Sequence, residues 1–335
     1  MSVSNEQRRF NWIHLYCDAL RWALVNEVTG GNYREIVTFQ DLVDGLYKWW
    51  LAVVQNNDLR QWAAAKRGRG CYWSSVLSYD FWYLYDLEAE LWGANFDRFL
   101  ARNVISDDVA LEPFRFVLLF YLIERALKLM LAHLCFLDYE LRNLSHARIR
   151  DTAYVHFFEQ ECLARWFPFP FNLSALTNRL VQGDADLLRH QRYGFVGNHF
   201  AVVGKTHYTQ VVESALRQAV MWQRDRHTNR GQRPPRGSIR AFFFDPLWRY
   251  SESYRYRVPL ASDYIRQNPF YWGLNLRWLG SAFLYIIELW LYTLSARLIR
   301  EVWDTYAQQS RSPTLQAVQL PRWQTFRDAS PQILI

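Results

Sequence analysis

The chain has 335 residues, of which 50% are hydrophobic and 21% are charged, and its net charge at pH 7 is +7. This length and hydrophobic content suffice for a sizeable buried core, which excludes an intrinsically disordered chain. The moderately basic balance permits a polyanionic partner without requiring one.

Arginine dominates the basic residues. Only four of the 39 are lysine, which leaves 35 arginines, and 16 Trp, 20 Tyr and 22 Phe accompany them. A guanidinium group binds phosphate or carboxylate through paired hydrogen bonds and stacks on aromatic rings. The composition therefore favours large polar interfaces or nucleic acid, with codon bias as the alternative explanation.

The cysteines and the opening residues bear on location. Cys17, Cys71, Cys135 and Cys162 form no CxxC pair, so neither a zinc module nor a redox dithiol is predicted. Buried free thiols in a reducing compartment are expected. The opening MSVSNEQRRFNW lacks the apolar core of a secretory signal, so we expect a cytoplasmic protein, or one carried in a virion if the chain is viral.

Helical periodicity covers most of the first half of the chain. The apolar stripe of residues 10–28 consists of Ile13, Cys17, Leu20, Leu24 and Val28. Residues 38–54 begin with Thr38 and Asp41, which form the pattern of a helix N-cap. Three further helices are expected: residues 78–100 with Phe81, Tyr85, Glu88 and Trp92, residues 114–137 after Pro113, and residues 151–166.

The second half is more mixed. Residues 193–205 are predicted to form a strand or a buried loop, and residues 211–226 a helix. Residues 227–240 combine arginine with glycine and proline, which predicts a linker or exposed arm. Alternating tyrosine and arginine predict a short strand at 250–257, and residues 272–306 follow one long helical pattern.

These elements predict a mainly α-helical fold, a large multi-helix globular protein with irregular loops and few or no strands. We predict a helical domain at 1–226, an arginine-rich loop or linker at 227–240 and a second helical lobe at 241–307. Residues 308–335 contain three prolines and little periodicity, which predicts an extended C-terminal arm that packs on this subunit or on a neighbour.

The stretch from Trp278 to Ala296 contains a single charged residue, Glu288, and is long enough to span a bilayer. Its apolar residues favour insertion by about 4 kcal/mol, and a central acidic group opposes it by roughly 3 kcal/mol, so insertion is marginal. We favour a buried core helix in which Glu288 meets an arginine of another helix.

No residue pattern supports catalysis, a cofactor or a metal site. Gly204-Lys205-Thr206 is similar to the end of a phosphate-binding loop, but His199 stands where that loop needs glycine. Asp107-Asp108 and Asp184/Asp186 fit helix caps or turns better than acid–base pairs or Mg²⁺ ligands. The expectation is a protein without catalytic residues, cofactor or metal.

The basic segments are the best functional signal. Arginines on glycine-rich backbone can follow a phosphate chain, and nearby aromatic rings can stack bases. The alternatives are a solvated loop, or arginines that pair with the carboxylates of a neighbouring subunit. The residues predicted to bind nucleic acid are Lys66, Arg67, Arg69, Arg224, Arg226, Arg230, Arg233, Arg236, Arg240, Arg255 and Arg257.

Together these features predict a non-enzymatic, self-assembling structural protein, such as a viral capsid protein or nucleoprotein, because aromatic residues and arginine are enriched at interface cores. Its expected partners are further copies of itself, in a homo-oligomer or shell, and nucleic acid, with RNA favoured. One alternative is a membrane-associated or organellar complex subunit anchored by residues 278–296. The other is a nucleic-acid-processing enzyme whose site the sequence does not reveal.

Overall fold

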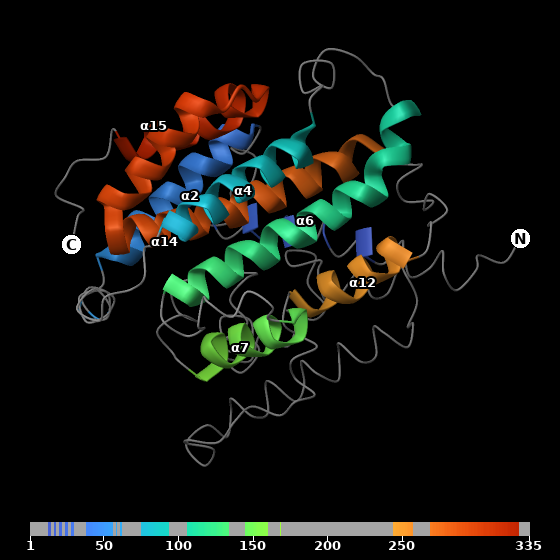
Figure 1. Cartoon of the computed structure of the whole chain (residues 1–335), viewed down its shortest axis with the longest axis horizontal. Helices are drawn as coiled ribbons and strands as arrows, with labels where there is room; N and C mark the ends of the chain where they lie inside the picture. Colours follow the sequence, from blue (N-terminus) through green and yellow to red (C-terminus); the bar gives the residue numbers. More distant parts are fainter. Residues whose placement is uncertain are drawn as a thin grey trace, which may run out of the picture. The chain divides into compact units, whose positions relative to one another are not determined.

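The computed structural model describes residues 38–55, 75–93, 106–133, 145–159, 244–256 and 269–327, together with single positions between 13 and 29 and residues 58, 61 and 168. This part of the chain is 93% helical and contains no strand, which confirms the mainly α-helical prediction. Its elements are α2 (Phe39–Val54), α4 (Ser75–Trp92), α6 (Ser106–His133), α7 (His146–Glu159), α12 (Phe244–Tyr256), α14 (Pro269–Gln309), the π-helix η5 (Leu315–Gln319) and α15 (Leu320–Arg327), as Figure 1 shows.

The chain divides into two compact units. Unit 1 consists of Met1–Gly31, Val109–Val117 and Ser145–Asn275, and unit 2 of Asn32–Asp108, Leu118–Leu144 and Leu276–Ile335. Each unit is therefore assembled from segments that lie far apart in the sequence.

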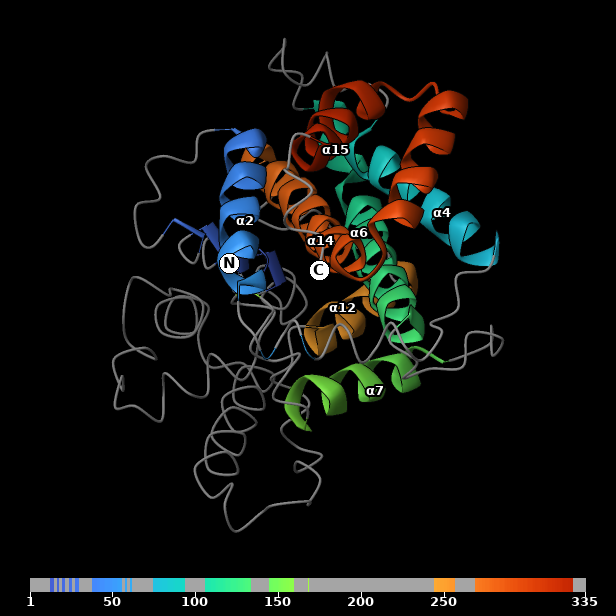
Figure 2. The same cartoon turned by 90° about the vertical axis from the view of Figure 1, so that its left-hand side faces the viewer.

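Unit 2 is built around α14. Every residue from Leu276 to Thr293 is buried, which explains why this helix is apolar on all sides and not only along one stripe. In both views α2, α4, α6 and α15 lie around it (Figures 1 and 2). The prediction of a core helix is confirmed, because Glu288 meets Arg322 of α15 inside the unit.

Polar side chains and one glycine fix how the neighbouring helices pack on α14. Trp50 Nε1 of α2 donates to Thr293 Oγ1 at 3.0 Å, and Trp92 Nε1 of α4 donates to Ser281 Oγ at 2.8 Å. A Cβ atom at Gly280 would lie 2.6 Å from Leu91 Cδ2 of α4. The absence of a side chain at Gly280 therefore lets α4 approach α14 closely.

The ends of α2 and α4 follow from their sequences. Thr38 Oγ1 accepts a hydrogen bond from Asp41 N, and the Asp41 carboxylate accepts one from Thr38 N, which confirms the predicted cap. Gly93 follows α4 with φ of 85°, a conformation that favours glycine at a helix C-terminus. The predicted extension of this helix to residue 100 is therefore wrong, since α4 ends at Trp92.

Unit 1 contains α7, α12 and the described N-terminal positions. Ile13, Cys17, Leu20 and Leu24 are helical and buried, as their spacing predicts. Tyr254 Oη of α12 lies 3.1 Å from His14 Nε2, and the Tyr254 ring lies beside Phe116 with 5.0 Å between ring centroids. The Arg150 guanidinium of α7 lies 4.6 Å from the Trp248 ring centroid.

Three sequence predictions need correction. The helix expected after Pro113 starts earlier, at Ser106, so that this proline lies inside α6. The helix expected from residue 151 begins at His146, where Ser145 Oγ accepts from Arg148 N at 3.3 Å. The strand predicted at 250–257 is wrong, because residues up to Tyr256 belong to α12, whose buried Phe244, Leu247, Tyr250 and Tyr254 recur at helical spacing.

The C-terminal arm also differs from its prediction. Residues 313–327 are helical and not extended, and their elements η5 and α15 belong to unit 2. The predictions for residues 193–205, 211–226 and 227–240, including the domain boundary placed there, lie outside the described residues.

Candidate functional site

A cluster of three charged side chains occupies the centre of unit 2. Glu88 comes from α4, Glu288 from α14 and Arg322 from α15, and the side chains are 0% exposed. Glu88 lies on the same face of α4 as the buried Phe81, Tyr85 and Trp92, so helical periodicity turns it inward with an aromatic stripe. We call Glu88, Glu288 and Arg322 the buried triad.

Both edges of the Arg322 guanidinium are used. Nη1 and Nη2 donate to the two carboxylate oxygens of Glu88 at 2.5 and 3.0 Å. Nη2 also donates to Glu288 Oε1 at 3.0 Å, and Nε lies 2.8 Å from Glu288 Oε2. The contact between Nε and Oε2 is an ion pair, but its N–H bond is not aimed at the oxygen as a hydrogen bond requires. Such paired contacts give geometric specificity as well as charge neutralisation.

Neutral donors complete the shell of the buried triad. Trp323 Nε1 donates to Glu288 Oε1 at 3.1 Å, and Gln319 Nε2 donates to Glu88 Oε2 and to the Tyr85 carbonyl, both at 3.1 Å. Gln319 is the last residue of the π-helix η5, and Trp323 belongs to α15. Short π-helical segments are rare and frequently occur at functional sites.

The buried triad combines two carboxyl groups with one guanidinium group. Burial raises the pKa of Glu288 against the opposing effect of Arg322, and the Glu88 charge raises it further. Burial alone would lower the pKa of Arg322, but the two carboxylates outweigh that effect and raise it. Burial and then the Glu288 charge also raise the pKa values of the Tyr85 and Tyr285 hydroxyl groups.

This arrangement is suited to holding α4, α14 and α15 together. The carboxylates have no exposed surface, and the guanidinium bonds to both of them.

Among the residues that the structure describes, no group of three or more His, Cys, Asp or Glu side chains is placed to hold a metal ion. Likewise, none of the described helices is long and apolar enough to cross a membrane.

The accessible face of α4 is different in character. Among the side chains of α4 that the structure describes, the exposed ones are Tyr79, Tyr83, Asp86 and Glu90, at spacings of four, three and four, so they form one line along the helix. Tyr79 is 65% and Tyr83 46% exposed, although most large aromatic residues of unit 2 are buried. We call these four residues the α4 stripe.

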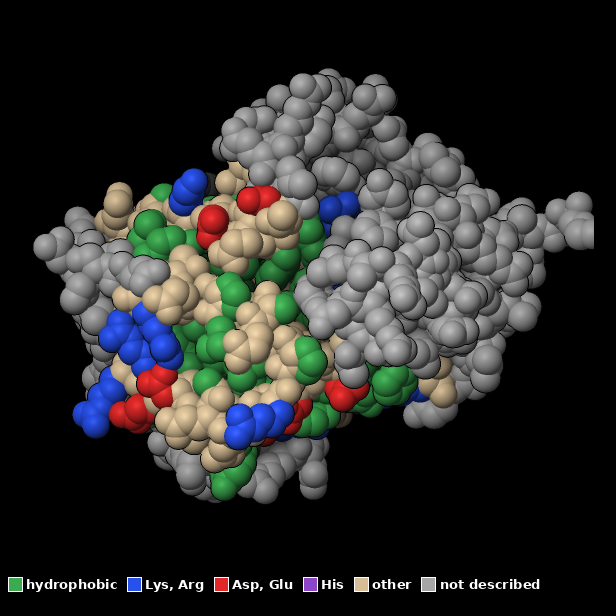
Figure 3. Space-filling view, turned by 90° about the horizontal axis from the view of Figure 1, so that it is seen from above, with side chains coloured by type: hydrophobic (Ala, Val, Ile, Leu, Met, Phe, Trp, Pro, Cys, Tyr) green, Lys and Arg blue, Asp and Glu red, His purple; other side chains and the backbone are tan. Residues whose placement is uncertain are grey.

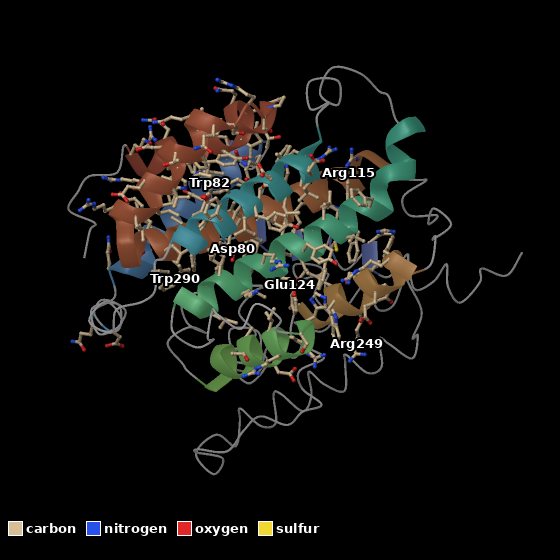
Figure 4. The ribbon with its side chains drawn as sticks, viewed as in Figure 1. Asp80, Trp82, Arg115, Glu124, Arg249 and Trp290 are labelled. Atoms are coloured by element: carbon tan, nitrogen blue, oxygen red, sulfur yellow. The ribbon has the colours of Figure 1, made fainter. Side chains whose placement is uncertain are left out.

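Side chains of unit 2 flank the α4 stripe. The ring of Trp82, labelled on α4 in Figure 4, packs edge-on against Tyr79 with 5.4 Å between centroids. The Arg125 guanidinium of α6 lies 5.9 Å from the Tyr83 ring centroid, and Tyr306 Oη donates to Asp86 Oδ1 at 2.9 Å. This surface was not predicted from the sequence, although its residues recur there at helical spacing.

Of the residues predicted to bind nucleic acid, the structure describes one. Arg255 lies on α12, partly buried, and its Nη2 donates to Ser251 Oγ at 3.1 Å. The remaining ten lie outside the described residues: Lys66, Arg67, Arg69, Arg224, Arg226, Arg230, Arg233, Arg236, Arg240 and Arg257.

No protein-family model matches this chain, and comparisons with curated proteins and with solved structures find no significant similarity.

Proposed function

We propose that this chain is a non-enzymatic, self-assembling structural protein, most consistent with a viral capsid protein or nucleoprotein. In this proposal it forms homo-oligomers and binds nucleic acid, with RNA favoured, through its arginine-rich segments. The observation that carries the proposal is the exposure of Tyr79 and Tyr83 on a regular helix. Exposed tyrosines are typical of the central residues of protein interfaces.

The buried triad supports a structural role. Glu88 and Glu288 are two carboxylates that the fold brings together in unit 2, yet both are enclosed and bonded to Arg322. A general acid or base must reach the proton that it transfers, and a group without exposed surface is poorly placed to do so.

The proposed nucleic-acid contact rests on the sequence of the basic segments. On the face in Figure 3, Lys and Arg side chains of the described part lie close to Asp and Glu side chains, so the charges are mixed there. A mixed surface gives a phosphate backbone little net attraction. The contact is therefore assigned to residues 66–69 and 224–240, whose basic groups are closely spaced in the sequence.

Light scattering coupled to size-exclusion chromatography, with the 260/280 absorbance ratio, tests both parts of the proposal. We expect particles far larger than the 40.1 kDa chain, with bound nucleic acid. Replacing Arg230, Arg233 and Arg236 with Glu should abolish nucleic acid retention and leave the helical content intact. Nucleic acid retention unchanged in this variant would remove the role assigned to the segment.

A matched control carries the same change in charge. Replacing Arg148, Arg297 and Arg311, which are exposed at described positions, with Glu should leave most of the nucleic acid bound. Equal loss in both triple variants would mean that net charge alone governs binding. A monomer with a protein-like absorbance ratio in the unmodified chain would contradict the proposed function as a whole.

A further inference from the structure

We infer that the α4 stripe is a docking site for the arginine-rich segment 224–240 of a second copy of this chain. The inference rests on the proposed function, since it names the contact through which copies associate; a segment that is docked on a neighbouring copy does not bind nucleic acid at the same time. It starts from the chemistry of the stripe, which joins two exposed aromatic rings to two exposed carboxylates in one line.

Charge decides between a protein and a nucleic acid as the occupant. Asp86 and Glu90 repel phosphate, so a nucleic acid that stacked bases on Tyr79 and Tyr83 would meet two negative charges further along the same line. A cationic chain is attracted by both carboxylates, although it also approaches the Arg125 guanidinium beside Tyr83. Tyrosine faces attract guanidinium groups, and carboxylates bind them through paired hydrogen bonds.

The chain uses the same chemistry within its own fold. Guanidinium groups lie over aromatic rings in unit 2, where Arg300 is 5.3 Å from the centroid of Tyr292 and Arg125 is 5.9 Å from that of Tyr83. In the buried triad, Arg322 bonds to two carboxylates at once. The α4 stripe presents both kinds of arginine acceptor on the surface, and Glu90 has no hydrogen-bond or ion-pair partner among the described residues.

The segment matches the stripe in length and spacing. From Tyr79 to Glu90 an α-helix rises roughly 16 Å. Arg230, Arg233 and Arg236 recur every three residues, and a fully extended chain would separate the first from the third by about 20 Å. Three arginines of this segment can therefore reach acceptors along the whole stripe.

The contact is tested with a fluorescently labelled peptide of residues 224–240, added to full-length protein whose own segment carries Arg230→Glu, Arg233→Glu and Arg236→Glu. We expect an anisotropy increase, weakened at least about fivefold by Glu90→Arg. Glu252→Arg, the same change at an exposed position of α12, should have little effect. A peptide that fails to bind, or that binds both variants equally, overturns the inference.

Mass measurements identify the occupant in the intact protein. Glu90→Arg should reduce the particle mass at a given concentration, and adding the three Glu substitutions to that variant should restore part of it, because a carboxylate of the segment can then pair with the guanidinium introduced at position 90. If Glu90→Arg leaves the mass unchanged and the unmodified chain still assembles, the docking inference is overturned while the proposed function stands. Stronger nucleic acid retention without a change in mass would identify nucleic acid as the occupant and overturn the inference as well.

If the peptide binds but the unmodified chain is monomeric, the segment docks within its own chain. This result would overturn both the second copy as the occupant and the proposed function. A circular dichroism spectrum and thermal midpoint equal to those of the unmodified chain show that each variant is folded.

Discussion

Arg322 is the residue on which the centre of unit 2 depends. Its guanidinium is the positive charge placed between two enclosed carboxylates. Assembling such a triad costs desolvation of three charges, so its net contribution to stability is small compared with the penalty for breaking it. The net contribution of the triad to stability and the penalty for breaking it are different free energies, and substitutions can measure each of them.

Replacing Arg322 with Met leaves Glu88 and Glu288 facing each other without a cation. We expect the free energy of unfolding to fall by about 3–5 kcal/mol, measured by urea denaturation. The triple variant Glu88→Leu, Glu288→Leu and Arg322→Met removes all three charges, so its free energy of unfolding should fall by less than that of the single variant. A larger fall in the triple variant would contradict the idea that unpaired buried charge causes the loss.

Arg327 provides the matched control for Arg322. It lies on the same helix and pairs with Asp304, but both side chains are substantially exposed. Arg327→Met should therefore lower the free energy of unfolding by about 1 kcal/mol or less.

Glu288 should give stability a specific pH dependence. Burial raises its pKa above the ordinary value of 4.5, so its contribution is fully present below pH 4.5 and is lost as pH rises through the raised pKa. Glu288→Gln lacks this titration. Its free energy of unfolding, relative to that of the unmodified chain, should therefore increase from pH 4.5 to pH 8. If denaturation experiments show a constant difference over this range, the raised pKa of Glu288 is contradicted.

At the scale of elements, Gly280 sets the distance between α14 and α4. A Cβ atom there would also lie 3.0 Å from Leu122 and 3.1 Å from Leu119, both on α6. Gly280→Val should lower the free energy of unfolding by about 2 kcal/mol or more, because the core has no room for the added atoms. In a Leu91→Ala background, where space has been created, the same substitution should cost less. Equal costs in the two backgrounds would place the clash elsewhere.

Most helices could be predicted from periodicity alone. The stripe of Phe81, Tyr85, Glu88 and Trp92 is buried throughout, and Glu288 meets an arginine as expected. The sequence could not identify that arginine, because Arg322 lies 34 residues from Glu288 and 234 from Glu88, and 35 arginines are available. A partner so distant is fixed by tertiary packing and not by spacing.

Two segments were predicted with the wrong secondary structure, and the two errors have separate physical causes. In α12, the alternation of tyrosine and arginine at its end obscured the helical recurrence of Leu247, Tyr250 and Tyr254. In the C-terminal segment, Pro313 and Pro321 suggested an extended arm. Both stand near helix starts, where a missing N–H and a fixed φ are tolerated.

At the scale of the whole molecule, association and folding should respond differently to salt. The side chains of the α4 stripe are exposed, where ions screen charges, whereas the buried triad is enclosed. Raising the salt concentration from about 50 mM to about 500 mM should reduce particle mass and nucleic acid retention. The thermal midpoint of the dissociated chain should change little over that range. Light scattering that is insensitive to salt would argue against a charged contact between copies.

The separation of Glu88 and Arg322 in the sequence also governs when unit 2 can finish folding in the cell. A ribosome adds about 5–20 residues per second, so the 234 residues between them take at least roughly 10 s to synthesise. Throughout that interval the nascent chain carries Glu88 without its cation. The buried triad therefore cannot be completed during synthesis of the first helices of unit 2, and it forms only after α15 has left the ribosome.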